Sequence, residues 1–320
     1  MTEGDEFARI ERIARVLGPS SAAEVELAIG DDAAILDPSR LRAGERLVWT
    51  IDACVEGVHF RRELLSWEDV GWRATVAAAS DLLAMGARPI AALAGWTLPE
   101  RFDDEAIESI ARGQRAACTA LGMALIGGNL ASAQELTLST TALGGVEQPV
   151  RRDGARPGDR LVVCGAVGEA ALGLAWLMRG REGAGAPALV AAWRRPPVRV
   201  VESRALAAIA TAMIDVSDGL AQDVGHLARA SGVRVVIEVA RLLSRRSAEF
   251  AAVGALLRLP LDHLELAGGE DYALVATVPA DATLPAGVDV IGTVHAGEGV
   301  DVLAADGRRW EAPPPGWRHR

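Results

Sequence analysis

Apolar and polar residues alternate along several short stretches of the chain and recur every three to four positions along others. The stretch Arg46–Asp52 alternates strictly, which predicts a β-strand with two unlike faces. Trp49 and Ile51 share one face of this strand, and Thr50 and Asp52 lie on the other.

The same two periods predict helices and strands through both halves of the chain. In the first half, the predicted helices are Thr2–Leu17, Trp67–Gly86 and Asp103–Gly122, and the further strands are Ile90–Leu98, Met123–Ile126 and Leu136–Gly144. In the second half, the predicted helices are Glu169–Met178, Val200–Met213 and Asp218–Ala230, and the strands are Leu161–Cys164, Val235–Val239, Ala273–Val278, Val288–Val294 and Val300–Leu303. Strands interleaved with helices in both halves predict two lobes of α/β or α+β class.

A polar stretch, Glu147–Asp159, separates the two halves and is rich in proline, glycine and charged residues. Such a composition is typical of a boundary between domains. A chain of 320 residues is also long enough for two cores of moderate size. We therefore expect an N-terminal domain over residues 1–148 and a C-terminal domain over residues 149–320.

Composition narrows the classes of function. All 33 basic residues are arginines, which excludes a phosphate-binding loop ending in Lys-Ser/Thr, a pyridoxal Schiff base and the lysine of a protein kinase. The arginines are scattered among 43 acidic residues, so we expect no nucleic-acid partner.

Apolar runs are shorter than the roughly 20 residues that cross a bilayer, and the N-terminus is acidic and amphipathic. We therefore expect no membrane partner and a cytoplasmic location. Three scattered cysteines predict neither a disulfide framework nor a cysteine-ligated zinc site.

Carboxylates stand at the edges of apolar stretches in the first half of the chain. Asp32 follows the turn residue Gly30, Asp52 ends the predicted strand, and Asp81 lies in an apolar helix without an arginine three or four positions away. A carboxylate in such surroundings needs a hydrogen bond, an ion pair or a metal ion. Asp32 also has a plainer explanation, an ordinary Asx turn. The nearby His59 is likewise explained by a purely structural role.

Two segments of the second half combine acids with glycines. Met213–Leu220 predicts a helix entry in which Asp215 and Asp218 flank a capping Ser217. In Leu266–Tyr272, two glycines precede two acids and allow backbone to approach a ligand. Taken alone, the first segment is explained by helix capping and the second by an ordinary glycine turn.

Together these segments place five aspartates at element edges, without a histidine or cysteine cluster beside them: Asp32, Asp52, Asp81, Asp215 and Asp218. Oxygen ligands alone select Mg²⁺ or Mn²⁺ over zinc. Several such ions in one site imply a polyphosphate ligand, because only such a ligand carries enough charge to share them.

In this order, the segments resemble thiamine-monophosphate kinase of the AIR-synthase-like (PurM-like) superfamily. The resemblance spans nearly the whole chain and rests on Ile29–Ala34, Asp52, Glu56–Phe60, Ser80–Ala87, Gly127–Gly128, Arg152–Asp159, Ile214–Leu220 and Gly268–Tyr272. It implies a two-domain PurM-like fold and a homodimer whose N-terminal domains share a β-barrel. It also implies that ATP and thiamine monophosphate yield ADP and thiamine diphosphate by direct in-line transfer, with several Mg²⁺ ions as cofactor.

The resemblance carries roles to individual positions. The residues that match the family's magnesium ligands are Asp32, Thr50, Ile51 (through its backbone), Asp52, Asp81, Asn129, Asp215 and Asp218. Those that match its ATP contacts are Gly128, Asn129, Arg152 and Ser217, and those that match its substrate contacts are His59, Glu270 and Trp317. The acceptor phosphate is already anionic near neutral pH, so no side chain is expected to act as a general base.

Two positions depart from the family's pattern. Asn129 stands where the family usually has Asp, which removes one charge and is expected to weaken the metal beside it. Ala192–Pro196 lacks the histidine that the family tends to carry before its Arg-Pro. The alternative function is a non-catalytic or weakly active relative that senses nucleotide or thiamine phosphates. Selenophosphate synthetases and hydrogenase-maturation proteins would need a reactive Cys with Lys near the N-terminus, or a C-terminal Cys, which the sequence lacks.

Overall fold

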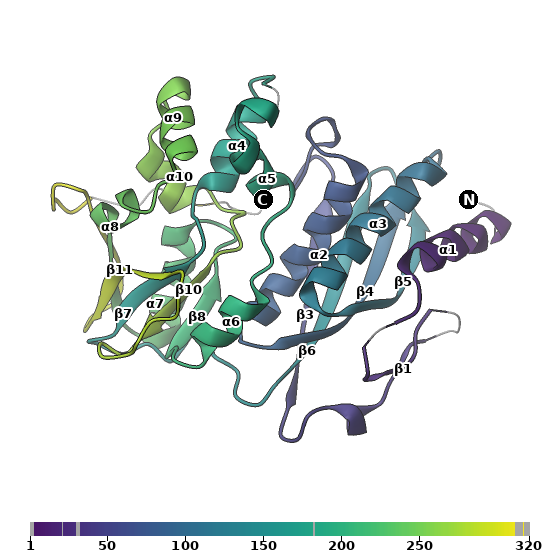
Figure 1. Cartoon of the computed structure of the whole chain (residues 1–320), viewed down its shortest axis with the longest axis horizontal. Coiled ribbons are helices and arrows are strands. Elements are labelled where there is room, and N and C mark those ends of the chain that lie inside the picture. The colour runs from purple at the N-terminus through teal and green to yellow at the C-terminus, as the bar shows by residue number, and fades with distance from the viewer. Residues whose placement is uncertain (1–2, 21, 30–32, 182, 311–315, 317–320) are drawn as a thin grey trace. The chain divides into compact units, whose positions relative to one another are not determined.

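The computed structural model describes residues 3–20, 22–29, 33–181, 183–310 and 316. Contacts divide the chain into two compact units. Unit 1 comprises Met1–Leu82 and Ala87–Gln148, and unit 2 comprises Leu83–Gly86 and Pro149–Arg320. Each unit combines a sheet with helices (Figure 1), which confirms the predicted fold class.

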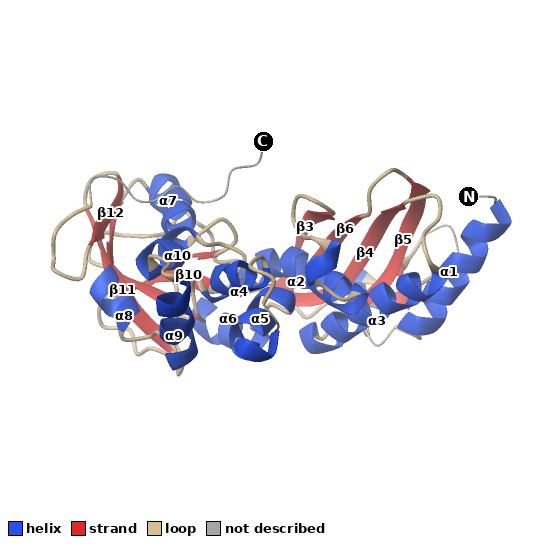
Figure 2. Ribbon diagram, turned by 90° about the horizontal axis from the view of Figure 1, so that it is seen from above, coloured by secondary structure: helices blue, strands red, loops and turns tan. Residues whose placement is uncertain are grey.

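A four-stranded sheet forms the centre of unit 1, in the order β3-β6-β4-β5. Its strands are β3 (Arg46–Val55), β4 (Arg88–Leu98), β5 (Ala124–Ser132) and β6 (Thr137–Val146). β4 and β5 are parallel, and β6 runs antiparallel to both β3 and β4. Helices α2 (Trp67–Ala84) and α3 (Asp104–Leu121) lie side by side along one face of the sheet (Figure 2).

The two faces of β3 differ as the alternation predicts. Val48 packs against Ala78 and Leu82 of α2. On the other face, Trp49 is 71% exposed and Ile51 is 64% exposed. The polar side of β3 therefore faces helix α2, and its apolar side faces away from that helix.

The N-terminal segment of unit 1 packs against α3 and the β4–β5 side of the sheet. It contains α1 (Glu3–Leu17), β1 (Val25–Leu27) and β2 (Ile35–Leu36). Arg9 of α1 donates to the carbonyl of Phe102 at 2.9 Å. Residues of the β1–β2 segment cover Ile90 and Ile126.

Unit 2 is built on a six-stranded sheet in the order β12-β9-β11-β7-β10-β8. The strands are β7 (Arg160–Cys164), β8 (Ala212–Asp215), β9 (Arg234–Glu238), β10 (Leu274–Val278), β11 (Val288–His295) and β12 (Gly299–Leu303). β12 and β9 are parallel, and the other neighbours are antiparallel. β10 and β7 lie inside the sheet, which explains why both are short, apolar and buried.

Seven helices are described around this sheet: α4 (Glu169–Leu177), α5 (Pro187–Arg194), α6 (Val200–Ala207), α7 (Leu220–Ser231), α8 (Val239–Leu243), α9 (Ala248–Leu257) and α10 (Leu261–Ala267). One apolar core joins α7 to strands β7 to β12 through residues such as Leu161, Val224 and Val302. Within the described chain, no helix has both the length and the apolar character that crossing a membrane requires.

One predicted element is wrong. The helix expected over Val200–Met213 ends at Ala207, and Ala212–Asp215 forms strand β8 instead. The four residues of β8 are buried and pair with β10, so burial between sheet and helices overrides the helical tendency of the preceding alanines.

Candidate functional site

In unit 1, two of the predicted magnesium ligands lie in contact. The hydroxyl of Thr50 on β3 donates to Asp81 of α2 at 2.5 Å between the oxygens. Asp81 is half-buried, and its helical neighbours Ser80 and Leu82 are buried. The polar side of β3 and the single acid in this stretch of α2 therefore provide adjacent oxygen ligands.

Asp52 lies two residues beyond Thr50 on the same side of β3 and is exposed. One of its carboxylate oxygens accepts the backbone N–H of Ala53 at 2.7 Å. The side chain of Ile51 lies on the opposite face, so only its backbone could join these ligands, as the sequence predicts.

His59 lies in the turn that follows β3. Its Nδ1 accepts the backbone N–H of Val55 at 3.1 Å, and the backbone N–H of His59 donates to the carbonyl of Val55 at 2.9 Å. The first bond holds the ring against the end of the strand and uses Nδ1 as an acceptor. Nδ1 is therefore not the atom that would meet a ligand.

Gly128 and Asn129 lie on β5, at the other edge of the sheet from β3. The register joins Asn129 through Gly95 and Ser139 to Ala53, on the face that carries the exposed Ile51. Asp52 belongs to the neighbouring row, on the face toward α2. Three strand spacings, roughly 14 Å, separate the two edges. Within one copy of unit 1, the sheet thus holds Asn129 apart from Asp52.

In unit 2, the second acidic group surrounds the loop between β8 and α7. Asp215 ends β8 and is 4% exposed. One oxygen of Asp223, in the first turn of α7, accepts backbone N–H groups of three successive loop residues, each at 3.1 Å: Ser217, Asp218 and Gly219. Asp223 therefore fixes the conformation of the loop that carries Ser217 and Asp218.

The electrostatics of this loop favour a cation. Burial, together with the negative charges of Asp215 and Asp218, raises the pKa of Asp223 to about 7. One ligand atom each from Asp218, Asp223 and His226 lie within 4.8 Å of one another. A divalent cation would relieve this repulsion, and the carboxylate oxygens suit Mg²⁺.

The segment that contains Glu270 packs directly on the same loop. The N–H of Glu270 donates to the carbonyl of Ser217 at 2.8 Å, and that of Tyr272 donates to the carbonyl of Val216 at 2.9 Å. The backbone is left-handed at both donors, with φ of 59° at Glu270 and 45° at Tyr272. The predicted ATP contact Ser217 and the predicted substrate contact Glu270 thus lie together, held by a strained turn.

Two side chains position Glu270. The indole N–H of Trp193, on α5, donates to its carboxylate at 2.9 Å. The neighbouring Asp271 is buried, and its two oxygens accept the N–H groups of Gly168 and Ala170 at 2.7 and 3.1 Å. Asp271 therefore joins the Glu270 turn to the start of α4.

Three predicted residues remain: Arg152, Asp32 and Trp317. Arg152 is exposed, and its carbonyl accepts the hydroxyl of Ser231 at 2.8 Å. Asp32 and Trp317 lie outside the described residues.

Sequence reasoning missed Trp193 and Asp223, and it singled out Asp271 only as an acid beside Glu270, without its structural role. An acid in the first turn of a helix after a glycine is a signal that could have identified Asp223 as a cap. Trp193 is 77 positions from Glu270, so no local pattern predicts their contact.

Comparison with known proteins decides the family. Residues 30–146 match the N-terminal domain of AIR synthase related proteins, and residues 156–304 match the C-terminal domain. Thiamine-monophosphate kinase of Aquifex aeolicus is 35% identical over 296 residues, covering 91% of this chain and 92% of the relative. That of Mycobacterium tuberculosis is 37% identical over 313 residues, covering 95% and 89%.

The chain belongs to the thiamine-monophosphate kinase family.

A solved structure of this family, AaThiL complexed with AMPPCP and TMP, superposes with a TM-score of 0.81 at 33% identity and covers 100% of this chain and 99% of that one. The thiamine-monophosphate kinase fold therefore extends over both units.

Proposed function

We propose that this chain transfers the γ-phosphate of ATP to thiamine monophosphate, yielding thiamine diphosphate and ADP. It is an ATP-dependent phosphotransferase by family. The observation that carries the proposal is identity of 35–37% to thiamine-monophosphate kinases along almost the whole chain. The relative AaThiL is solved with AMPPCP and TMP, which supports the same pair of ligands for this chain.

The proposed chemistry depends on charge rather than on a general base. Both reactants are polyanions, and the acceptor oxygen already carries negative charge near neutral pH. In unit 1, Thr50, Asp52 and Asp81 would hold Mg²⁺, and in unit 2, Asp215 and Asp218 would do so, with Asp32 as a further candidate. Bound Mg²⁺ supplies neutralisation of the phosphate oxygens and alignment of donor and acceptor.

The protein's own groups would orient the two substrates. Backbone at Gly128 and the side chains of Arg152 and Ser217 are the proposed ATP contacts. His59, Glu270 and Trp317 are the proposed contacts to thiamine monophosphate. Trp193 holds the carboxylate of Glu270 in one orientation, which reduces the entropy lost when substrate binds.

We further propose that the protein works in the cytoplasm as a homodimer. The support for the dimer is the apolar face of the unit 1 sheet, where exposure reaches 53% at Leu47, 71% at Trp49, 64% at Ile51 and 36% at Leu93. An apolar face of this kind on a soluble protein is typical of an interface.

The test of the function measures thiamine diphosphate formed from ATP and thiamine monophosphate at millimolar Mg²⁺. We expect product, and no product once EDTA removes the metal. The alternative, a non-catalytic sensor, rests on Asn129 in place of Asp. Tight binding of both substrates without any product would support the sensor and exclude the kinase.

A further inference from the structure

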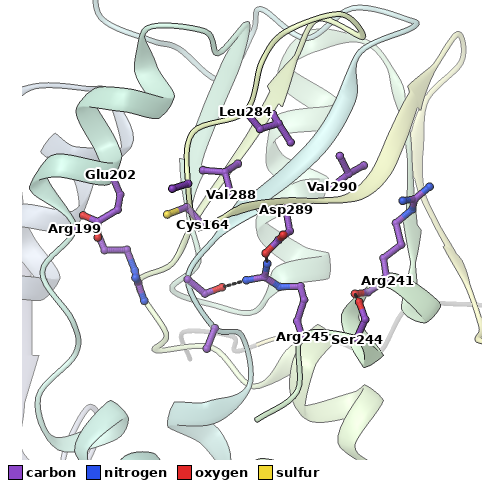
Figure 3. Close-up of a pocket in the computed structure, with 14 residues that line it drawn as sticks. Cys164, Arg199, Glu202, Arg241, Ser244, Arg245, Leu284, Val288, Asp289 and Val290 are labelled. Atoms are coloured by element: carbon purple, nitrogen blue, oxygen red, sulfur yellow. Dashed lines mark hydrogen bonds and ion pairs between the residues drawn. The ribbon is translucent and has the colours of Figure 1, made fainter.

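A cavity of about 790 Å³ lies in unit 2, apart from the acidic loops (Figure 3). Its walls come from the end of β7 at Cys164 and Gly165, the start of α6, the turn after α8, and the loop from β10 to β11. This volume is in the range of pockets that hold small metabolites, about 300–1,000 Å³.

The lining of the cavity is positively charged, although the chain carries a net charge of −10. Three arginines line it, Arg199, Arg241 and Arg245, against two acids, Glu202 and Asp289. Among these five side chains the arginines are in excess by one. Glu238, outside the lining, pairs with Arg241, so the attraction for an anion is local to Arg199 and Arg245.

The arginines differ in how they are paired. Arg241 donates to Glu238 at 2.9 Å. Arg245 donates to the carbonyl of Gly165 at 2.8 Å and forms an ion pair with Asp289, whose side chain is 57% exposed. Each of these two guanidiniums is thus paired with one carboxylate. The carboxylate of Asp289 is also hydrated, which weakens its pairing with Arg245.

Arg199 is the exception. Its Nε is buried and has no hydrogen-bond partner among the described residues. The guanidinium lies against Gly165, where an added Cβ would meet its Cζ at 2.5 Å. A buried guanidinium N–H without an acceptor costs free energy that an incoming oxygen atom would recover.

The two guanidiniums nearest to Gly165 also oppose each other. Burial lowers the pKa of Arg245, and the positive charge of Arg199 lowers it further. An oxyanion bound beside both would offset the burial and the repulsion. Guanidinium groups bind phosphate oxygens in pairs of parallel hydrogen bonds, which suits a phosphate better than a halide or a neutral ligand.

The apolar part of the lining consists of Leu284, Val288 and Val290. Val288 is buried, whereas Leu284 and Val290 are half-buried and keep some apolar surface exposed. A phosphate attached to an organic group would cover this surface and occupy volume that a free phosphate ion would leave to water.

We propose that this cavity is a second anion site, which binds a phosphorylated small molecule through Arg199 and Arg245. It is separate from the ATP and thiamine monophosphate contacts named above, and none of those residues lines it. Cys164 pairs through Leu274 with Asp215 across the sheet, so the two sites lie about two strand spacings, roughly 10 Å, apart along that row.

The experiment uses the full chain in EDTA, without nucleotide, and ribose 5-phosphate as the probe. Binding is measured by calorimetry and by the rise in melting temperature, with ribose, inorganic phosphate and citrate as comparison ligands. We expect ribose 5-phosphate to bind, inorganic phosphate to bind more weakly, and ribose not to bind. Citrate binding as tightly as ribose 5-phosphate would overturn the assignment to phosphate.

Variants locate the site. Arg199→Met should weaken binding by roughly tenfold to a hundredfold, because it removes the charged hydrogen bonds. Arg308→Gln, an exposed arginine of the same unit, is the matched control and should bind as the wild type does. Arg152→Gln separates this site from the proposed ATP contact and should also retain binding.

Two results would overturn the proposal: equal binding by wild type and Arg199→Met, or loss of binding in Arg152→Gln with retention in Arg199→Met. If Arg199→Met fails to fold, Arg199→Lys takes its place. Lysine keeps the charge but not the paired hydrogen bonds, so it should bind the probe more weakly than wild type.

Discussion

At the scale of single residues, the surroundings of each carboxylate decide its role. Asp81 accepts a hydroxyl from Thr50 and stays half-buried, whereas Asp271 is buried and accepts two backbone N–H groups. The first can exchange its partner for a metal ion. The second is committed to holding the turn of Glu270.

Asp271 gives a pH dependence that can be measured. Burial raises its pKa from 3.8 to about 7. Between these values the folded protein keeps a proton that the unfolded chain has lost, so the free energy of unfolding falls as pH rises from about 4 to about 7. Asp271→Asn cannot titrate and should show a flatter profile in urea unfolding over this range. Identical slopes for the two proteins would contradict this assignment.

Asn129→Asp tests the departure from the family. The substitution restores the negative charge at a position that matches one of the family's metal ligands, so it should lower the Mg²⁺ concentration needed for half-maximal rate. Asn129→Ala should raise that concentration. Kinase assays over a magnesium titration measure both, and an unchanged requirement in both variants would show that Asn129 does not ligate the metal.

The sequence predicts the residue-scale site in part. Alternation along β3 predicts that Thr50 and Asp52 share a face. The hydrogen bond from Thr50 to Asp81 shows that this face is the one toward α2. The contact of Trp193 with Glu270 joins segments whose separation in the chain carries no periodic signal. Side chains that position a ligand contact from another element therefore emerge only from the folded chain.

At the scale of elements, the sheet of unit 1 depends on close approach between β4 and β5. A Cβ added at Gly128 would meet the carbonyl oxygen of Ala94 at 2.0 Å, whereas one at Gly127 would meet only the end of the Leu93 side chain, at 2.8 Å. The backbone cannot yield as a flexible side chain can.

Gly128→Ala should therefore lower the free energy of unfolding by roughly 1–3 kcal/mol or more, because it forces two strands apart. Gly127→Ala is the matched control and should cost less than about 1 kcal/mol. Urea denaturation compares the two, and equal losses would mean that the Ala94 carbonyl is not the obstacle.

Elements were predicted well where one period dominates. The long helix near residues 67–86 and the apolar strands of unit 2 are confirmed, with small differences at their ends. The Val200–Met213 helix failed because alanines of α6 and the buried residues of β8 form one apolar run, which periodicity alone cannot divide.

At the scale of the whole molecule, the apolar face of unit 1 predicts self-association. Trp49→Glu places a charge at its most exposed residue and should shift the protein from dimer to monomer, as measured by light scattering after size-exclusion chromatography. Leu256→Glu is the matched control, since Leu256 is 59% exposed on α9 of unit 2. A wild-type protein that is already monomeric, or a dimer that survives Trp49→Glu, would contradict the interface.

The sequence does not predict every residue of the two units. Contacts change from one unit to the other at Gln148, yet Leu83–Gly86, at the end of α2, group with unit 2, whose other residues begin only at Pro149. Ser203 of α6 donates to the carbonyl of Leu83 at 2.6 Å, which accounts for part of that grouping. No composition shift marks those four residues.

The hydrogen bond from Trp193 to Glu270 also gives the molecule an internal spectroscopic probe. Because the indole is 1% exposed and bound to the carboxylate that is proposed to meet thiamine monophosphate, its electronic surroundings change when that carboxylate is engaged. In protein labelled with fluorotryptophan, the ¹⁹F resonance that disappears in Trp193→Phe should shift on adding thiamine monophosphate. If that resonance stays fixed while the substrate binds, Glu270 does not take part, and occupancy of the site could not be followed in this way.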